Sequence, residues 1–112
     1  MISYDDFTRV DMRVGVIVEA QDFPEARKPA FRLKVDFGPE IGIKNSSAQL
    51  TRRYRREDLI GRKVVAVVNF PPKKVASFVS EILVLGVDDS KGGVILLAIE
   101  NSEDALPGTR VY

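Results

Sequence analysis

The chain has 112 residues and a mass of 12.5 kDa, so we expect residues 1–112 to form a single small domain. Its composition, 45% hydrophobic and 29% charged, is typical of a chain that folds. The lack of cysteine and histidine excludes disulfides, zinc–thiolate sites, cysteine nucleophiles and histidine acid–base catalysis. We therefore expect a binding module and not an enzyme, with no metal site and no cofactor.

Positive charge is concentrated in the middle of the chain. Residues 27–74 contain 13 of the 17 basic side chains and four of the 16 acidic ones, which is a net charge of +9. The two flanking segments together carry a net charge of −8. Such asymmetry indicates an anionic partner for the middle segment. The alternative is a solvated charged surface without a partner.

The N-terminal residues predict a short helical turn. Ser3 and Asp6 have the spacing of a shortened capping box, and the turn runs into residues 7–10. The same segment carries acids where a signal peptide needs basic residues. The longest apolar run, residues 94–99, is too short to cross a membrane as a helix. We therefore expect a cytoplasmic protein without membrane insertion.

Period-two alternation and β-branched runs predict strands along most of the chain. The clearest example is residues 31–37, where apolar and charged side chains alternate and Phe31 and Phe37 fall on the core-facing side. A short helix within residues 51–60 is expected to end at Gly61. Residues 88–93 are typical of a hairpin loop. The expected strands are residues 14–18, 31–37, 41–43, 62–69, 79–85 and 94–99.

About five strands of even spacing, one short helix and a basic middle segment predict an all-β fold in the form of a small barrel. The OB-fold, a five-stranded Greek-key barrel that commonly binds nucleic acid on one face, fits this pattern. It would carry a short N-terminal helical turn and a C-terminal extension. An SH3-like barrel or a small sandwich fits nearly as well, and periodicity alone does not choose among the three.

Four arginines surround one tyrosine in the middle of the chain. Arginine binds phosphate in bidentate geometry, and an aromatic ring can stack on a base, which is how looped or single-stranded RNA is commonly held. The alternative is that Tyr54 anchors the core while the arginines are exposed or paired to Glu57 and Asp58. The members of this arginine run are Arg52, Arg53, Arg55 and Arg56.

A second candidate is the loop expected after the strand at residues 62–69. Pro71 and Pro72 end that strand, because proline cannot donate to the ladder, and Lys73 and Lys74 follow them. Binding residues favour such rigid loops, although two lysines are also ordinary exposed residues. Asn69, at the strand end, can donate to a ligand or close the turn.

Two phenylalanines, Phe70 and Phe78, bracket that loop. Exposed, they would form an apolar pocket for a peptide or a base. Buried, they would belong to the core. The sequence leaves both interpretations open.

Several segments, in order, resemble the tRNA-binding domain family, whose module is an OB-fold. Residues 10–20 (VDMRVGVIVEA) resemble the opening of that module, and residues 64–72 and 80–85 resemble its second and third signatures. Within that family, the sequence resembles most closely the CsaA branch, whose members are described as export-related chaperones. The segments that carry this closer resemblance are residues 23–30, 36–39 and 44–49.

The resemblance implies a non-enzymatic homodimer that binds unfolded or precursor polypeptides, acts in protein export and has a capacity for tRNA binding. It also implies that the N-terminal turn and the C-terminal tail lie near the dimer interface. The alternative is a structure-specific tRNA-binding protein that uses the basic segment 27–74 and has no chaperone role. For tRNA we expect contacts from Arg52, Arg53, Arg55, Arg56, Lys73, Lys74, Asn69 and Ser80. For polypeptides we expect contacts from Phe70, Phe78, Phe31 and Arg27.

Overall fold

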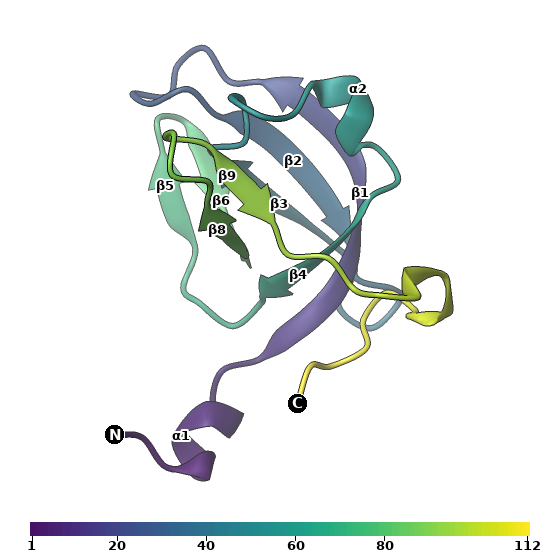
Figure 1. Ribbon diagram of the computed structural model, residues 1–112. Coiled ribbons are helices and arrows are strands. Elements are labelled where there is room, and N and C mark those ends of the chain that lie inside the picture. The colour runs from purple at the N-terminus through teal and green to yellow at the C-terminus, as the bar shows by residue number, and fades with distance from the viewer.

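A computed structural model describes residues 1–112, and Figure 1 shows a curled sheet with two small hairpins on one side. The helices and strands, in chain order, are α1 (Tyr4–Thr8), β1 (Met12–Asp22), β2 (Phe31–Asp36), β3 (Ile43–Ala48), α2 (Arg56–Leu59), β4 (Lys63–Val67), β5 (Lys73–Val75), β6 (Phe78–Ser80), β7 (Leu83–Val84), β8 (Gly86–Asp88), β9 (Val94–Leu96) and the 3₁₀ turn η1 (Ser102–Asp104).

Strand β1 organises the main sheet, in which the strand order is β3-β2-β1-β4-β7 and neighbouring strands are antiparallel. Residues 12–16 of β1 pair with β4 and residues 16–22 pair with β2, and the register of the β1–β2 pairing shifts between Ile17 and Glu19. Such a bulge bends a strand and increases its twist. At Gly15 an added Cβ would lie 2.5 Å from a methyl group of Val35, so the strand needs glycine where the sheet curls.

The sheet is nearly closed into a barrel between β3 and the segment after β6. The N–H of Glu81 donates to the carbonyl of Asn45 at 2.8 Å. The N–H of Asn45 donates in return to the Glu81 carboxylate at 3.0 Å, and the N–H of Ser47 donates to the Ser80 hydroxyl at 3.1 Å. A five-stranded antiparallel barrel with this connectivity is an OB-fold. The expected all-β class is confirmed, and the OB-fold is selected over the other two candidate architectures.

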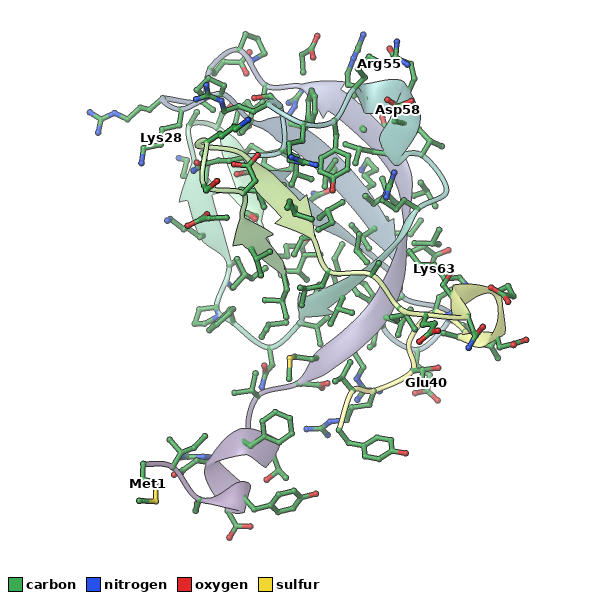
Figure 2. The ribbon with its side chains drawn as sticks, in the orientation of Figure 1. Met1, Lys28, Glu40, Arg55, Asp58 and Lys63 are labelled. Atoms are coloured by element: carbon green, nitrogen blue, oxygen red, sulfur yellow. The ribbon has the colours of Figure 1, made fainter.

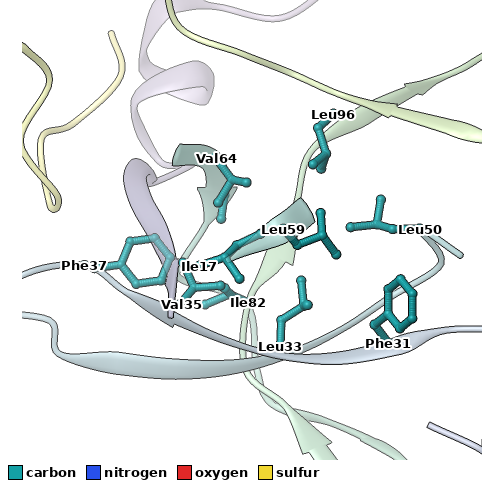
Figure 3. Packing of buried hydrophobic residues seen from close by; sticks show 11 residues of the cluster. Ile17, Phe31, Leu33, Val35, Phe37, Leu50, Leu59, Val64, Ile82 and Leu96 are labelled. Atoms are coloured by element: carbon teal, nitrogen blue, oxygen red, sulfur yellow. The ribbon is translucent and has the colours of Figure 1, made fainter. Parts of the chain in front are cut away.

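The barrel is filled mainly by side chains of β1, β2 and β4, together with side chains from outside the main sheet such as Leu50 and Leu96 (Figure 3). Phe31, Leu33, Val35 and Phe37 alternate inward from β2 and the residue after it, so the predicted period-two strand is confirmed. The expectation that Phe31 contacts a polypeptide is wrong, because its side chain is only 6% exposed and belongs to this core. Leu59, the buried residue of α2, packs into the same cluster.

The two ends of the chain meet beside the start of β1. Helix α1 begins with the predicted capping box, in which Ser3 and Asp6 exchange bonds, and it buries no residue. Figure 1 shows it projecting from the barrel near the C-terminus. The C-terminal tail lies along β1, since the N–H of Val14 donates to the carbonyl of Thr109 and the N–H of Val111 to that of Met12. The expected helical turn and C-terminal extension are therefore both present.

Two strand predictions and one loop prediction need correction. The strand expected at residues 41–43 begins only at Ile43, because Gly42 has a positive φ and closes a turn back to Phe37. The strand expected at residues 79–85 is divided between β6 and β7. Lys73 and Lys74 lie in strand β5, which pairs with β6, and not in a loop. No helix of the protein has the length and apolar character needed to cross a membrane.

Candidate binding site

The arginine run is largely neutralised by acids. Arg53 pairs with Asp89 at 3.2 Å and Arg55 with Asp58 at 3.1 Å. Arg56 lies 3.5 Å from Asp22 and 3.8 Å from Glu57. The hydrogen bond from Arg55 to Asp58 raises the pKa of the Arg55 guanidinium, which is the response of a charge held by its partner. Three of the four arginines therefore meet carboxylates of the same molecule.

Tyr54 is a structural residue. Its hydroxyl accepts a hydrogen bond from the N–H of Leu96 at 3.1 Å, and its ring packs against the core. The Arg62 guanidinium lies 5.2 Å from the centre of the ring. This geometry corresponds to the alternative in which the tyrosine anchors the fold.

The amide of Asn69 ties the chain's N-terminal segment to the end of β4. Its oxygen accepts from the N–H of Asp11 at 3.0 Å, and its nitrogen donates to the carbonyl of Arg9 at 2.8 Å. Asn69 therefore closes the fold locally with both ends of its side chain.

A basic groove of about 680 Å³ lies between the β1–β2 loop and the β5–β6 hairpin. Its cations are Arg27 and Lys28 from the loop, and Lys73 and Lys74 from the hairpin. All four side chains are exposed, and none is within ion-pair distance of an acid. The groove joins residues that are more than 40 positions apart in the chain. Because its four cations are exposed and unpaired, their charge is available to a ligand.

Arg52 is the one member of the arginine run that faces this region. It borders a second hollow together with Lys28, Gln49 and Gly92. Lys28 and Gln49 also border the basic groove, so the two hollows lie next to each other. Figure 2 shows Lys28 and Arg55 toward one end of the molecule and Glu40 and Met1 toward the other.

An apolar cavity of about 670 Å³ opens between the end of β3, the β5–β6 hairpin and strands β7 to β9. Phe70 stands at its edge with 52% of its surface exposed, and Ile82, Val94 and Leu96 line it more deeply. Ser80 also lines it, but the Ser80 hydroxyl already bonds the N–H of Ser47. The cavity offers an open apolar surface that the fold itself does not fill.

The basic groove and the apolar cavity share a border. Ser47, Gln49, Lys73 and Val75 line both. A ligand that lies across this border meets cations on one side and apolar side chains on the other. The arrangement supplies charge, hydrogen-bonding groups and apolar contact, which are the components of a binding surface.

Phe78 lies away from the apolar cavity, on the outer face of the barrel. Its ring meets that of Phe23 edge-on, with centroids 5.5 Å apart. The Arg32 guanidinium lies 5.6 Å from the Phe23 ring and 5.7 Å from the Phe78 ring. Phe70 and Phe78 thus have different surroundings, although they bracket the same hairpin in the sequence.

Sequence reasoning did not single out Lys28 and Gln49 as site residues. Lys28 belongs to the basic segment and to residues 23–30, which carry the closer family resemblance, and the prolines at positions 24 and 29 indicate that its loop is held in place. Gln49 ends residues 44–49, which also carry the resemblance, but its position where the two hollows and the cavity meet depends on the fold.

Comparison with known proteins places this geometry in a family. The family model of a putative tRNA binding domain matches residues 12–110. The crystal structure of the chaperone CsaA of Bacillus anthracis strain Ames is 51% identical and superposes with a TM-score of 0.91, covering 100% of this chain and 99% of that one. The CsaA chaperone protein of Picrophilus torridus is 50% identical, with the same TM-score and full coverage of both chains.

A longer relative contains a similar segment. The methionine–tRNA ligase of Methanocaldococcus jannaschii is 36% identical over 115 residues, which covers 98% of this chain but only 16% of the ligase. The match therefore concerns one part of that enzyme. The chain belongs to the putative tRNA-binding domain family, as a domain of the CsaA type.

Proposed function

We propose that this protein is a non-enzymatic binding protein that holds unfolded or precursor polypeptides in the apolar cavity. The observation that carries the proposal is the cavity itself, with the half-exposed Phe70 at its edge and Ile82 and Leu96 beneath. Exposed apolar surface of this kind marks interaction sites. Two CsaA proteins to which it is similar are named chaperones, which supports the same assignment. The proposal includes a cytoplasmic location and a role before protein export.

The test is suppression of aggregation of a chemically denatured enzyme, followed by light scattering. Phe70→Ala should reduce the suppression several-fold, because it removes apolar area from the cavity edge. Ile60→Ala is the matched control, since Ile60 is 51% exposed but lies outside the cavity. Equal suppression by the Phe70 variant and the wild type would rule out the cavity as the polypeptide site.

A second function, tRNA binding, is favoured by the basic groove. Arg27, Lys28, Lys73 and Lys74 are exposed and unpaired on its two sides. Contacts between such cations and phosphates make affinity fall with salt, with a log–log slope of roughly −0.7 to −0.9 per contact. Gel-shift titrations of tRNA at several salt concentrations measure this slope. An affinity that does not change with salt would remove tRNA from the proposal.

The proposal also includes a homodimer. Exposed apolar side chains gather at the two chain ends, which lie beside each other at the start of β1. A five-residue helix that buries nothing is too short to be stable alone, so α1 needs a partner surface. The exposed residues are Met1, Ile2, Tyr4, Leu106 and Tyr112. Size-exclusion chromatography with light scattering should give the mass of two chains, and Tyr4→Ser should shift it toward one.

A further inference from the structure

Two strand edges that face the apolar cavity are left without a neighbouring strand. Strand β8 pairs only with β9, in a two-stranded sheet. The hydrogen bonds from the N–H of Asp89 to Gly93 and from the N–H of Leu97 to Leu85 fix which residues of β8 face its partner. Since these pairs alternate in an antiparallel ladder, Val87 faces β9, and Gly86 and Asp88 turn their N–H and C=O groups away from it.

The outward groups of β8 point toward open space. Gly86 and Asp88 are both exposed, and both line the apolar cavity, whereas Val87 between them does not. The residues of β8 whose backbone groups point away from β9 are therefore the same residues that line the cavity. An edge with free N–H and C=O groups is a template for pairing with another extended chain.

The opposite wall of the cavity is the end of β3. The N–H of Phe37 donates to Gly42, so the outward residues on the other edge of β3 are Asn45 and Ser47, followed by Gln49. Glu81 and Ser80 cover this edge as far as the N–H of Ser47. Beyond it, Ser47 and Gln49 line the cavity. The junction between β3 and residues 80–81 is therefore closed beside Asn45 and open beside Gln49.

We propose that an extended polypeptide enters this opening and pairs its backbone with the free edge of β8, with the end of β3 along its other side. This inference rests on the proposed polypeptide binding and adds how the chain is held. Main-chain hydrogen bonds give affinity without a requirement for a particular sequence, and alternate side chains reach the apolar lining. This mode suits a protein that binds many different unfolded segments.

The charge at the opening favours a polypeptide over a nucleic acid. Asp88 and Glu81 stand against a single cation, Lys73, and Glu81 lies 3.9 Å from Lys44. A phosphate backbone would meet the unpaired carboxylate of Asp88 here, whereas the basic groove next door has four cations and one carboxylate, Glu25. A strand with apolar side chains and flanking lysines is complementary to this lining.

N-methylation of a peptide tests the pairing without altering the protein. The probe is a short soluble peptide of alternating valine and threonine with lysine at both ends, and its affinity is measured by fluorescence anisotropy. Methylation of the amides of one alternate set removes the donors on one edge of the strand. We expect at least one of the two sets to weaken binding by about tenfold or more, since several backbone bonds are lost together.

A pair of protein variants gives a second readout. Asp88→Pro removes the outward N–H of β8 and leaves the ladder to β9 intact, because proline is tolerated where the N–H points away from the partner strand. Asp88→Ala keeps the N–H and removes only the carboxylate. We expect the proline variant to bind the unmodified peptide about tenfold more weakly than the alanine variant, because only the proline variant has lost the outward N–H as well as the carboxylate. Amide exchange at Gly86 and Asp88 should slow when the peptide is bound.

The outcomes separate this inference from the proposed function. If the unmodified peptide does not bind, both are overturned. If it binds but neither methylated set is weakened, and the amides of Gly86 and Asp88 exchange as fast as in the free protein, only strand pairing is overturned. Protection of those two amides by tRNA and not by the peptide would assign the opening to RNA and overturn the inference as well.

Discussion

The arginine run and the basic groove carry the same sign of charge but differ in what surrounds them. Three arginines of the run lie within 3.8 Å of a carboxylate, whereas the four cations of the groove have no such partner. The run is the denser cluster in the sequence, and the groove is assembled from two segments far apart in it. The comparison teaches that a dense run of positive charge in the sequence can be paired in the fold, while cations far apart in the chain gather unpaired.

The largest expected effect is the loss of tRNA binding when the groove is neutralised. Arg27→Ala, Lys73→Ala and Lys74→Ala together should lower the affinity about thirtyfold and reduce the magnitude of the salt slope by about 2 to 3, since each phosphate contact contributes to both. Gel-shift titrations at several salt concentrations measure the two quantities.

The matched control for that experiment removes the same amount of charge from the run. Arg53→Ala, Arg55→Ala and Arg56→Ala together should change the tRNA affinity by less than about threefold, because their charges are already balanced by Asp89, Asp58, Asp22 and Glu57. A larger loss from this variant than from the groove variant would reverse the comparison.

The aromatic residue of the run should affect stability and not binding. Tyr54→Phe removes the acceptor for the N–H of Leu96 in a partly buried position, which should cost about 1 kcal/mol of unfolding free energy. Urea denaturation measures this change, and the tRNA affinity should stay at the wild-type value. An unchanged urea midpoint together with weaker tRNA binding would return Tyr54 to the list of ligand contacts.

How far the sequence predicts this molecule depends on the range of the interaction concerned. The alternation of residues 31–37, the capping box of Ser3 and Asp6 and the turn at residues 88–93 are local patterns, and the structure has all three. The pairing of Arg53 with Asp89 spans 36 positions, and a composition count does not contain it. The open edge of β8 has no sequence signal, because its free groups belong to the backbone.

A smaller effect should follow from releasing the arginines of the run. Asp22→Asn, Glu57→Gln and Asp58→Asn together leave Arg55 and Arg56 unpaired and should raise the tRNA affinity about threefold. The control, Glu40→Gln with Glu103→Gln and Asp104→Asn, changes the net charge equally but keeps the ion pairs of Arg53, Arg55 and Arg56. Equal gains from both variants would mean that net charge, and not pairing, decides the affinity.

The smallest expected effect is an acid-dependent loss of stability at the Arg53–Asp89 pair. The backbone N–H groups of Lys91 and Gly93 lower the pKa of the Asp89 carboxyl, and Arg53 adds to this in the same direction. An aspartate in the unfolded chain has a pKa of about 3.9, so a lowered folded-state pKa means that the ionised form stabilises the fold. This contribution is complete above about pH 4 and is lost as the pH falls through the folded-state pKa.

Two variants divide this contribution between its causes. The difference in Tm between the wild type and Asp89→Asn should be constant near neutral pH and shrink below about pH 4. Protonation of Asp89 removes the negative charge from the wild type, and the variant has already lost that charge through the substitution. Arg53→Gln should retain most of this pH dependence, since the two backbone donors are the larger cause of the lowered pKa. If Arg53→Gln abolished it, the arginine would be the main stabilising partner of Asp89. The arginine run would then stabilise the fold through its charge, whereas the cations of the basic groove would remain free to bind a ligand.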